Sequence, residues 1–178
     1  PGSFLGNFTP AIQAQVGFDA RVVIPATHDT GAAVMAVPSV SEHGSYISSG
    51  TWSLMGIETV EPVISRESLN ANFTNEGGYD YRFRCLKNIM GLWMIQNVRH
   101  DTGDRYSWTD LTRMAHEAIS FPSRVEVDHS CFLAPDNMTE EIRGDCRRTS
   151  QPAPGTAGEV SSVVYQSLAG DYGRTADE

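Results

Sequence analysis

The chain has 178 residues, 40% of them apolar, and its 22 acidic and 13 basic side chains give a net charge of −9. A chain of this size can bury one substantial core, which predicts a single globular domain. A negative surface repels a phosphate-rich polymer, so the composition argues against nucleic-acid binding. The longest apolar runs fall short of the ~18 residues of a membrane span, so we expect no membrane partner.

The cysteines and most of the histidines give no sign of a metal site. Cys85, Cys131 and Cys146 are an odd number at irregular spacing, which is neither a disulfide framework nor a zinc motif. We therefore expect a reducing compartment, the cytoplasm. Four histidines have no metal-ligand spacing and are interpreted as surface or capping residues: His43, His100, His116 and His129.

The first half of the chain reads mainly as strands. Residues 21–25 (RVVIP) form a short β-type run, and residues 31–37 form a helix of small residues that ends at a proline. Residues 44–58 carry two β-prone stretches around an SSGT sequence, which predicts a hairpin. Residues 81–86 predict a further strand, so several adjacent strands form one sheet.

The second half reads mainly as helices. A helix is predicted from residue 88 to residue 100, with Asn88 as its N-cap and basic residues in its last turn. Ser107 and Asp110 resemble a capping box that opens a second helix, and residues 150–158 form a Pro/Gly-rich connector before the last one. The apolar stripes of the last two helices are Leu111, Met114, Ala115 and Ala118, then Val160, Val163, Val164 and Leu168. This order predicts an α/β or α+β fold with a mixed sheet flanked by helices.

Asp29 lies between the first of these strands and the following helix, at a position where ligands of open α/β sheets gather. On local grounds, capping of the helix by Asp29 or Thr30 is the favoured interpretation, because both residue types are strong N-caps. A hydrolase that uses the adjacent His28 and Asp29 is a rival interpretation. However, neighbouring side chains at a strand end usually point apart, and the sequence has no Ser or Cys nucleophile motif.

Two further stretches have groups that suit a ligand. Residues 48–51 (SSGT) offer amides, hydroxyls and a glycine that suit a phosphate, although the same composition is common in turns. Gln96 is expected on the apolar face of its helix, in line with Ile89, Leu92 and Trp93. There its amide needs a partner, and a core carbonyl is about as good a candidate as a ligand.

Six stretches resemble, in order and wording, the FGGY family of sugar kinases, and within it the subgroup that phosphorylates L-rhamnulose. They are PATHDTGAAVMAVPS, YISSGTWSLMGIE, NFTNEGG, LKNIMGLWMIQNVR, FLAPDNM and SLAGDY. SSGTW alone is modest evidence, whereas the succession of THDT, YISSGTWSL and LKNIMGLW is specific to the subgroup. Gly31 departs from the family, which usually has a small side chain there, and the change is expected to loosen the helix start without touching the carboxylate.

The resemblance implies an ATP-dependent kinase that transfers the γ-phosphate to a ketose such as L-rhamnulose, with Mg²⁺ accompanying the nucleotide. It implies that Asp29 contacts the sugar and is the base that takes the proton from the attacking hydroxyl. The other implied contacts are His28, Thr30 and Asn88 to the ketose, and Thr51 and Gln96 to the nucleotide. The alternative is a non-catalytic relative that binds a sugar or a partner protein, which would have no need of the base.

The fold implied is the actin-like, ribonuclease-H-like ATPase architecture, in which two such domains close on the substrates. Residues 1–16 resemble the tail of the amino-terminal domain. Residues 17–178 resemble the carboxyl-terminal domain, ending before the glycine-rich loop for the adenosine. The chain alone is therefore expected to fold but to be inactive, because the missing amino-terminal domain would supply the rest of the site.

Overall fold

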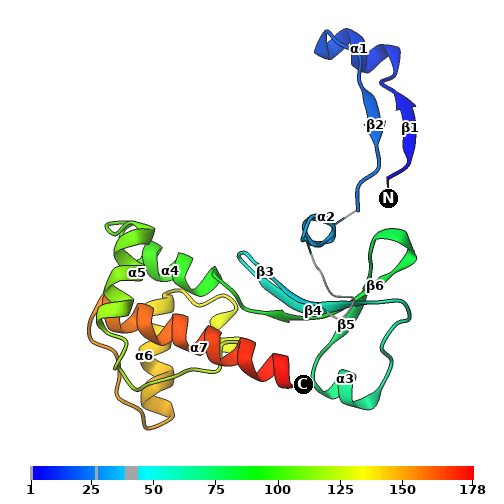
Figure 1. Cartoon of the computed structure of the whole chain (residues 1–178). Helices are drawn as coiled ribbons and strands as arrows, with labels where there is room; N and C mark the ends of the chain where they lie inside the picture. Colours follow the sequence, from blue (N-terminus) through cyan, green and yellow to red (C-terminus); the bar gives the residue numbers. More distant parts are fainter. Residues whose placement is uncertain (1, 27, 39–43) are drawn as a thin grey trace. The chain divides into compact units, whose positions relative to one another are not determined.

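The computed structural model describes residues 2–26, 28–38 and 44–178 (Figure 1). The chain, expected to form one domain, divides into two compact units. The first unit consists of Pro1–Ser48 and Gly56–Leu86, and the second unit consists of Ser49–Met55 and Lys87–Glu178. The described residues contain both helices and strands in quantity, which confirms the mixed α and β class.

A small two-stranded sheet opens the first unit. Strand β1 (Phe4–Asn7) pairs antiparallel with β2 (Arg21–Val23), and helix α1 (Pro10–Val16) connects them. Thr9 is the N-cap of α1, and Gly17 ends the helix with a φ of 80°. The predicted strand is therefore confirmed over residues 21–23 of the RVVIP run, and it ends two residues earlier than expected.

Four strands form the larger sheet, in the order β3-β4-β6-β5. They are β3 (Ser45–Ser49), β4 (Ser53–Thr59), β6 (Phe83–Ile89) and β5 (Thr74–Gly77). Residues 50–52 join β3 to β4, a connection too short for a parallel crossover, so the predicted hairpin is confirmed. Strands β5 and β6 are antiparallel, and Glu76 lies directly opposite Arg84.

Besides α1, the described residues of the first unit form three short helical segments. Helix α2 (Asp29–Met35) confirms the predicted helix of small residues and begins two residues earlier than expected. Helix α3 (Arg66–Asn70) begins with a capping box formed by Ser65 and Ser68. The 3₁₀ turn η1 (Tyr79–Tyr81) precedes β6.

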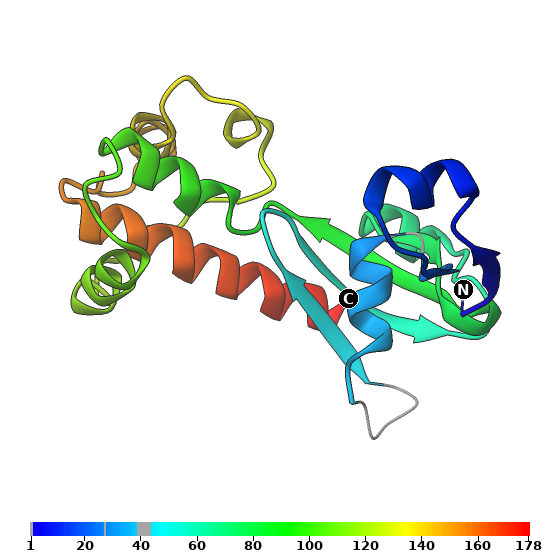
Figure 2. The same ribbon diagram turned by 90° about the horizontal axis from the view of Figure 1, so that it is seen from above.

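Four helices surround the core of the second unit: α4 (Trp93–Asp101), α5 (Trp108–Glu117), α6 (Met138–Arg148) and α7 (Ala157–Asp177). The predicted capping box of α5 is confirmed, because Ser107 Oγ accepts from the Asp110 amide and the Asp110 carboxylate accepts from the Ser107 amide, both at 3.1 Å. Helix α7, drawn orange to red in Figure 2, packs on α5 and α4. No helix among the described residues is both long and apolar enough to cross a membrane.

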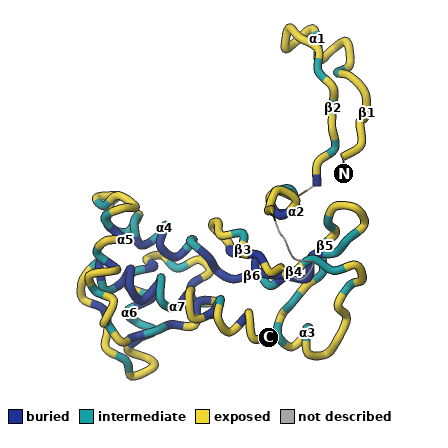
Figure 3. Tube along the Cα trace, viewed as in Figure 1, coloured by how far each residue is buried: buried dark blue, intermediate teal, exposed yellow. Residues whose placement is uncertain are grey.

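The apolar core of the second unit lies between these helices (Figure 3). The stripe predicted on α7 is confirmed, since Val160, Val163, Val164 and Leu168 are all buried. Leu111 on α5 faces the same core, as do Met138 and Ile142 on α6. Each such side chain contributes about 1.5–3 kcal/mol when fully buried, so this core supplies much of the stability of the unit.

The helix predicted from residue 88 begins later, so the N-cap role of Asn88 was wrong. Asn88 is an exposed residue of β6, and α4 starts at Trp93 with Leu92 as its N-cap. Gly91, whose φ is +65°, separates the strand from the helix. The apolar stripe was wrong as well: the buried side chains of α4 are Met94, Ile95 and Val98, and Gln96 is only half-buried.

The histidines and cysteines have ordinary surroundings. His100 and His116 are exposed in the last turns of their helices, and His129 is the N-cap of the 3₁₀ turn η2 (Ser130–Phe132), whereas His43 lies outside the described residues. All three cysteines are free thiols. Within residues 2–26, 28–38 and 44–178, no group of three His, Cys, Asp or Glu side chains could hold a metal ion.

Candidate functional site

Asp29 presents an exposed carboxylate at the start of α2, where the next two residues are buried. It is the first residue of α2, and its side chain is 94% exposed. Its Oδ1 accepts a 2.7 Å hydrogen bond from the Thr30 amide, while Thr30 and Gly31 are buried. The N-cap of α2 is His28, so neither Asp29 nor Thr30 caps the helix as the local pattern suggested. The buried residues Thr30 and Gly31 thus fix the start of α2, while the Asp29 carboxylate stays exposed to solvent.

His28 lies beside this carboxylate. Its Nε2 is 3.4 Å from Asp29 Oδ1, so the expectation that the two side chains point apart was wrong. The imidazole is about half exposed, and such an exposed pair contributes at most about 1 kcal/mol to stability. The contact therefore adds little to the stability of the fold.

A second group of polar side chains forms where α4 meets the turn between β3 and β4. The first amides of a helix have no partner within it, and here two of them donate to the turn. The Leu92 amide donates to Gly50 O at 3.0 Å, and the Trp93 amide donates to Thr51 O at 2.9 Å. One turn further along α4, Gln96 Nε2 lies 3.5 Å from Thr51 Oγ1. The structure thus brings Thr51 and Gln96 together at the start of α4.

The turn itself offers hydroxyls rather than its glycine amide. The Gly50 amide donates to Trp52 O at 3.0 Å, so it is already bonded within the turn. Ser49 and Thr51 are exposed, and a hydroxyl at such a position can donate to a phosphate. Asn88 is an exposed residue of β6, and no hydrogen bond in the described parts of the chain joins it to Thr51 or Gln96.

Long-range contacts hold this second group in place, and sequence reasoning missed them. Ser53 Oγ and Tyr172 OH are 2.6 Å apart, which ties β4 to the SLAGDY segment of α7. Asp128 Oδ1 accepts from the Met90 amide at 2.9 Å, just before Gly91. Although Asp128 as a residue is exposed, desolvation of its carboxyl raises its pKa. No local pattern marks these partners, because they are distant in sequence.

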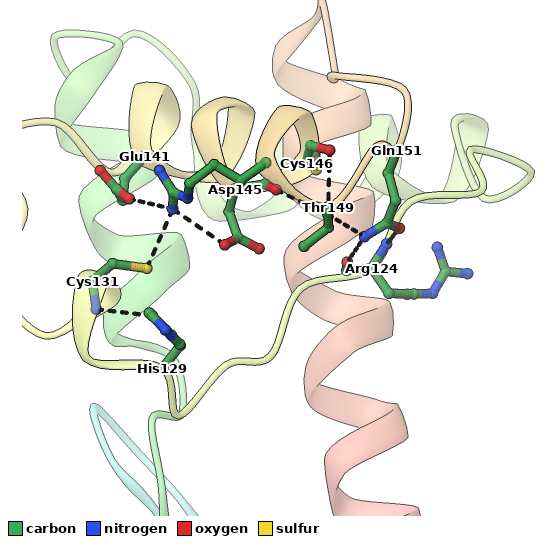
Figure 4. Close-up of polar contacts among 9 residues, drawn as sticks. Arg124, His129, Cys131, Glu141, Asp145, Cys146, Thr149 and Gln151 are labelled. Atoms are coloured by element: carbon green, nitrogen blue, oxygen red, sulfur yellow. Dashed lines mark hydrogen bonds and ion pairs between the residues drawn. The ribbon is translucent and has the colours of Figure 1, made fainter.

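A third polar cluster joins η2 to α6 (Figure 4). Arg148 Nη2 lies 2.7 Å from Glu141 Oε1, 3.2 Å from Asp145 Oδ1 and 3.8 Å from Cys131 Sγ. Burial, with the nearby Glu141 charge, raises the pKa of the Cys131 thiol to about 11. A thiol with so high a pKa is a poor nucleophile at neutral pH, so we interpret this cluster as a structural contact between η2 and α6.

Residues 45–172 match the family model described as the FGGY family of carbohydrate kinases, C-terminal domain. The chain is also similar to curated proteins named rhamnulokinase. Identity is 51% with that of Oceanobacillus iheyensis, 50% with that of Halalkalibacterium halodurans and 43% with that of Bacteroides thetaiotaomicron, in each case over 97% of this chain. The chain spans only 36% of the length of each relative.

These matches agree with the architecture of the chain. The mixed α and β arrangement is that of the actin-like ATPase fold. Both the family model and the relatives cover most of the chain, and the family model includes the hairpin, helices α4, α5 and α6, and α7 as far as residue 172. The chain belongs to the FGGY family of carbohydrate kinases, and its residues 45–172 match the carboxyl-terminal domain of that family.

Proposed function

We propose that the full-length protein containing this chain is an ATP-dependent kinase that phosphorylates a hydroxyl group of a ketose, with L-rhamnulose as the first candidate. The observation that carries the proposal is the exposed carboxylate of Asp29 on its anchored turn. The relatives named rhamnulokinase support the choice of substrate. We assign residues 1–16 to the end of the amino-terminal kinase domain, which supplies the rest of the site.

Asp29 is proposed as the general base. Phosphoryl transfer needs mainly positioning and charge stabilisation, with one carboxylate to orient or deprotonate the acceptor hydroxyl. Oδ1 is held by the Thr30 amide and lies beside His28, so we assign Oδ2 to receive the proton. His28 and Asn88, both exposed, are proposed to bond the ketose directly. Thr30, which is buried, contributes through its amide and the placement of the base.

Thr51 and Gln96 are proposed to contact the nucleotide. When bound, ATP supplies the phosphoryl group and brings Mg²⁺ with its phosphates. Mg²⁺ is often held by nucleotide phosphates, water and one or two carboxylates, so a three-ligand protein site is not required. The exposed hydroxyl of Thr51 and the amide of Gln96 fit the nucleotide, since both can donate to phosphate or ribose oxygens. The free thiols and the need for ATP fit the cytoplasm, where we place the protein.

Ketose-dependent ATP consumption by the full-length protein tests this function. The panel is L-rhamnulose, L-fuculose, L-ribulose, D-xylulose and D-fructose, and L-rhamnulose is expected to give the highest kcat/KM. Thr51→Ala and Gln96→Ala should raise KM for ATP several-fold and leave KM for the ketose unchanged. Thr112→Ala, at an exposed threonine of α5, is the control and should change neither constant. Absence of ketose-dependent ATP consumption across the panel would reject the proposal.

A further inference from the structure

Four polar residues lie in the part of the larger sheet that belongs to the first unit, one on each strand. In strand order they are Tyr46 on β3, Glu58 on β4, Arg84 on β6 and Glu76 on β5. Arg84 is only 2% exposed, and its Nη2 lies 2.9 Å from Glu76 Oε2, its cross-strand partner. Burial raises the pKa of Tyr46 to about 12, an effect that the Arg84 charge opposes and the two glutamates reinforce. These four groups therefore form one electrostatic cluster.

The first turn of helix α2 lies against the guanidinium of Arg84. A Cβ built on Gly31 would lie 3.2 Å from both Arg84 Cζ and Nη2 and 3.2 Å from Ala26 Cβ. The glycine thus lets the first turn of α2 approach the guanidinium closely. Asp29 belongs to that same turn, and its carboxylate is exposed. Arg84 therefore lies on the buried side of the helix turn whose exposed side carries the Asp29 carboxylate.

We propose that Arg84 is a positioning residue for Asp29: held by Glu76, its guanidinium fixes the first turn of α2 and thereby the direction of the carboxylate. The role given to Asp29 rests on the proposed function. The planar guanidinium suits this task because the helix turn can pack against it while one of its nitrogens is held by the Glu76 carboxylate. Gly31, which the sequence suggested would loosen the helix, has a packing role here.

Kinetics of the full-length kinase separate positioning from simple stabilisation of the fold. Below the melting temperature, Arg84→Met should lower kcat by about 10–100-fold, the range expected when a catalytic group is misplaced by about 1 Å. KM for ATP should stay within about twofold of the parent value, since Thr51 and Gln96 are untouched. Arg84→Lys keeps the charge and should fold even if the Met variant does not. Its loss of kcat should be smaller. Unchanged kcat in both variants would overturn the proposal.

A double-mutant cycle with Asp29→Asn tests whether Arg84 acts through the base. If it does, Arg84→Lys should cause no further loss of kcat in the Asp29→Asn background, whereas its effect on the melting temperature should persist. Two losses that multiply would show that Arg84 acts independently of Asp29, and would overturn the positioning role.

Amide hydrogen exchange gives a readout that does not depend on catalysis. Peptides covering residues 29–35 should exchange faster in Arg84→Lys and in Gly31→Val, whose side chain pushes against the guanidinium. Ala33→Val adds the same side chain on the exposed face of α2 and should leave the exchange of residues 29–35 unchanged. In all three variants, the exchange of peptides from α5 should also be unchanged. A normal kcat of the Asp29→Asn variant would reject the assignment of Asp29 as the base, but the hydrogen-exchange test of how Arg84 holds α2 would remain valid. Unchanged exchange of α2 in Arg84→Lys and Gly31→Val would overturn the positioning role itself.

Discussion

Gly91 lies so close to Ser53 that a Cβ on the glycine would come within 2.6 Å of the Ser53 amide nitrogen. The φ of Gly91 is +65°, a left-handed conformation that side chains disfavour. Its position lets α4 begin directly against the turn between β3 and β4, where the Trp93 amide donates to Thr51 O. The spacing of Thr51 and Gln96 therefore depends on one residue that has no side chain.

Gly91→Ala is expected to destabilise the full-length protein through both strain and a clash. The left-handed conformation costs about 1–2 kcal/mol for Ala, and the overlap with the Ser53 backbone adds about 1–3 kcal/mol. Gly103→Ala is the matched control, because Gly103 has a φ of +66° and nothing within 4 Å of its Cβ position. Thermal melting of both variants checks this. Equal melting temperatures for the two would contradict the close packing at Gly91.

Asp128→Asn is expected to make the protein more stable at neutral pH. Desolvation raises the pKa of Asp128 in the folded state, so ionisation of this carboxyl costs stability above that pKa. Asn removes the charge and keeps an oxygen that accepts from the Met90 amide. The gain should be present at pH 7 and should shrink as the pH falls through the folded pKa, where wild-type Asp128 is also neutral.

Melting temperatures of both proteins between pH 4 and pH 8 check this dependence. Asp136→Asn, at an exposed aspartate of the loop before α6, serves as the control for loss of one negative charge. If Asp128→Asn is less stable than the wild type at pH 7, or if the difference in melting temperature is the same at every pH, ionisation of Asp128 does not cost stability.

Cys131 is expected to react slowly with iodoacetamide. With a pKa of about 11, only about one thiol in a thousand is ionised at pH 8, so labelling should be at least about tenfold slower than for an ordinary cysteine. The Glu141 charge raises this pKa and the Arg148 charge lowers it. Glu141→Gln should therefore speed labelling, and Arg148→Gln should slow it. Mass spectrometry of the labelled protein measures both rates, and identical rates would rule out this electrostatic control.

Local patterns predicted those parts of the fold that depend on neighbours in sequence. The capping box of Ser107 and Asp110 and the stripe of α7 were both confirmed, because capping and helical periodicity act over one or two turns. Asn88 shows the limit of this reasoning. Its capping preference was overridden by extension of β6 within the sheet, and the break fell at Gly91, whose role depends on the distant hairpin.

The candidate site divides in the same way. The position of Asp29 between a strand and a helix could be read from the sequence, and so could the SSGT turn. Arg84 could not, since an arginine in a strand is usually exposed and its burial here depends on packing against α2. Contacts between residues far apart in sequence, such as Ser53 with Tyr172, leave no local signal.

The most direct test of the proposed chemistry is the kcat of the Asp29→Asn variant of the full-length kinase with L-rhamnulose. Asn keeps the size of the side chain and an oxygen for the Thr30 amide, but it removes the carboxylate that accepts a proton. We predict a kcat lower by roughly 10²–10⁴-fold, with substrate affinity and melting temperature little changed. A kcat near that of the parent enzyme would contradict the assignment of Asp29 as the base.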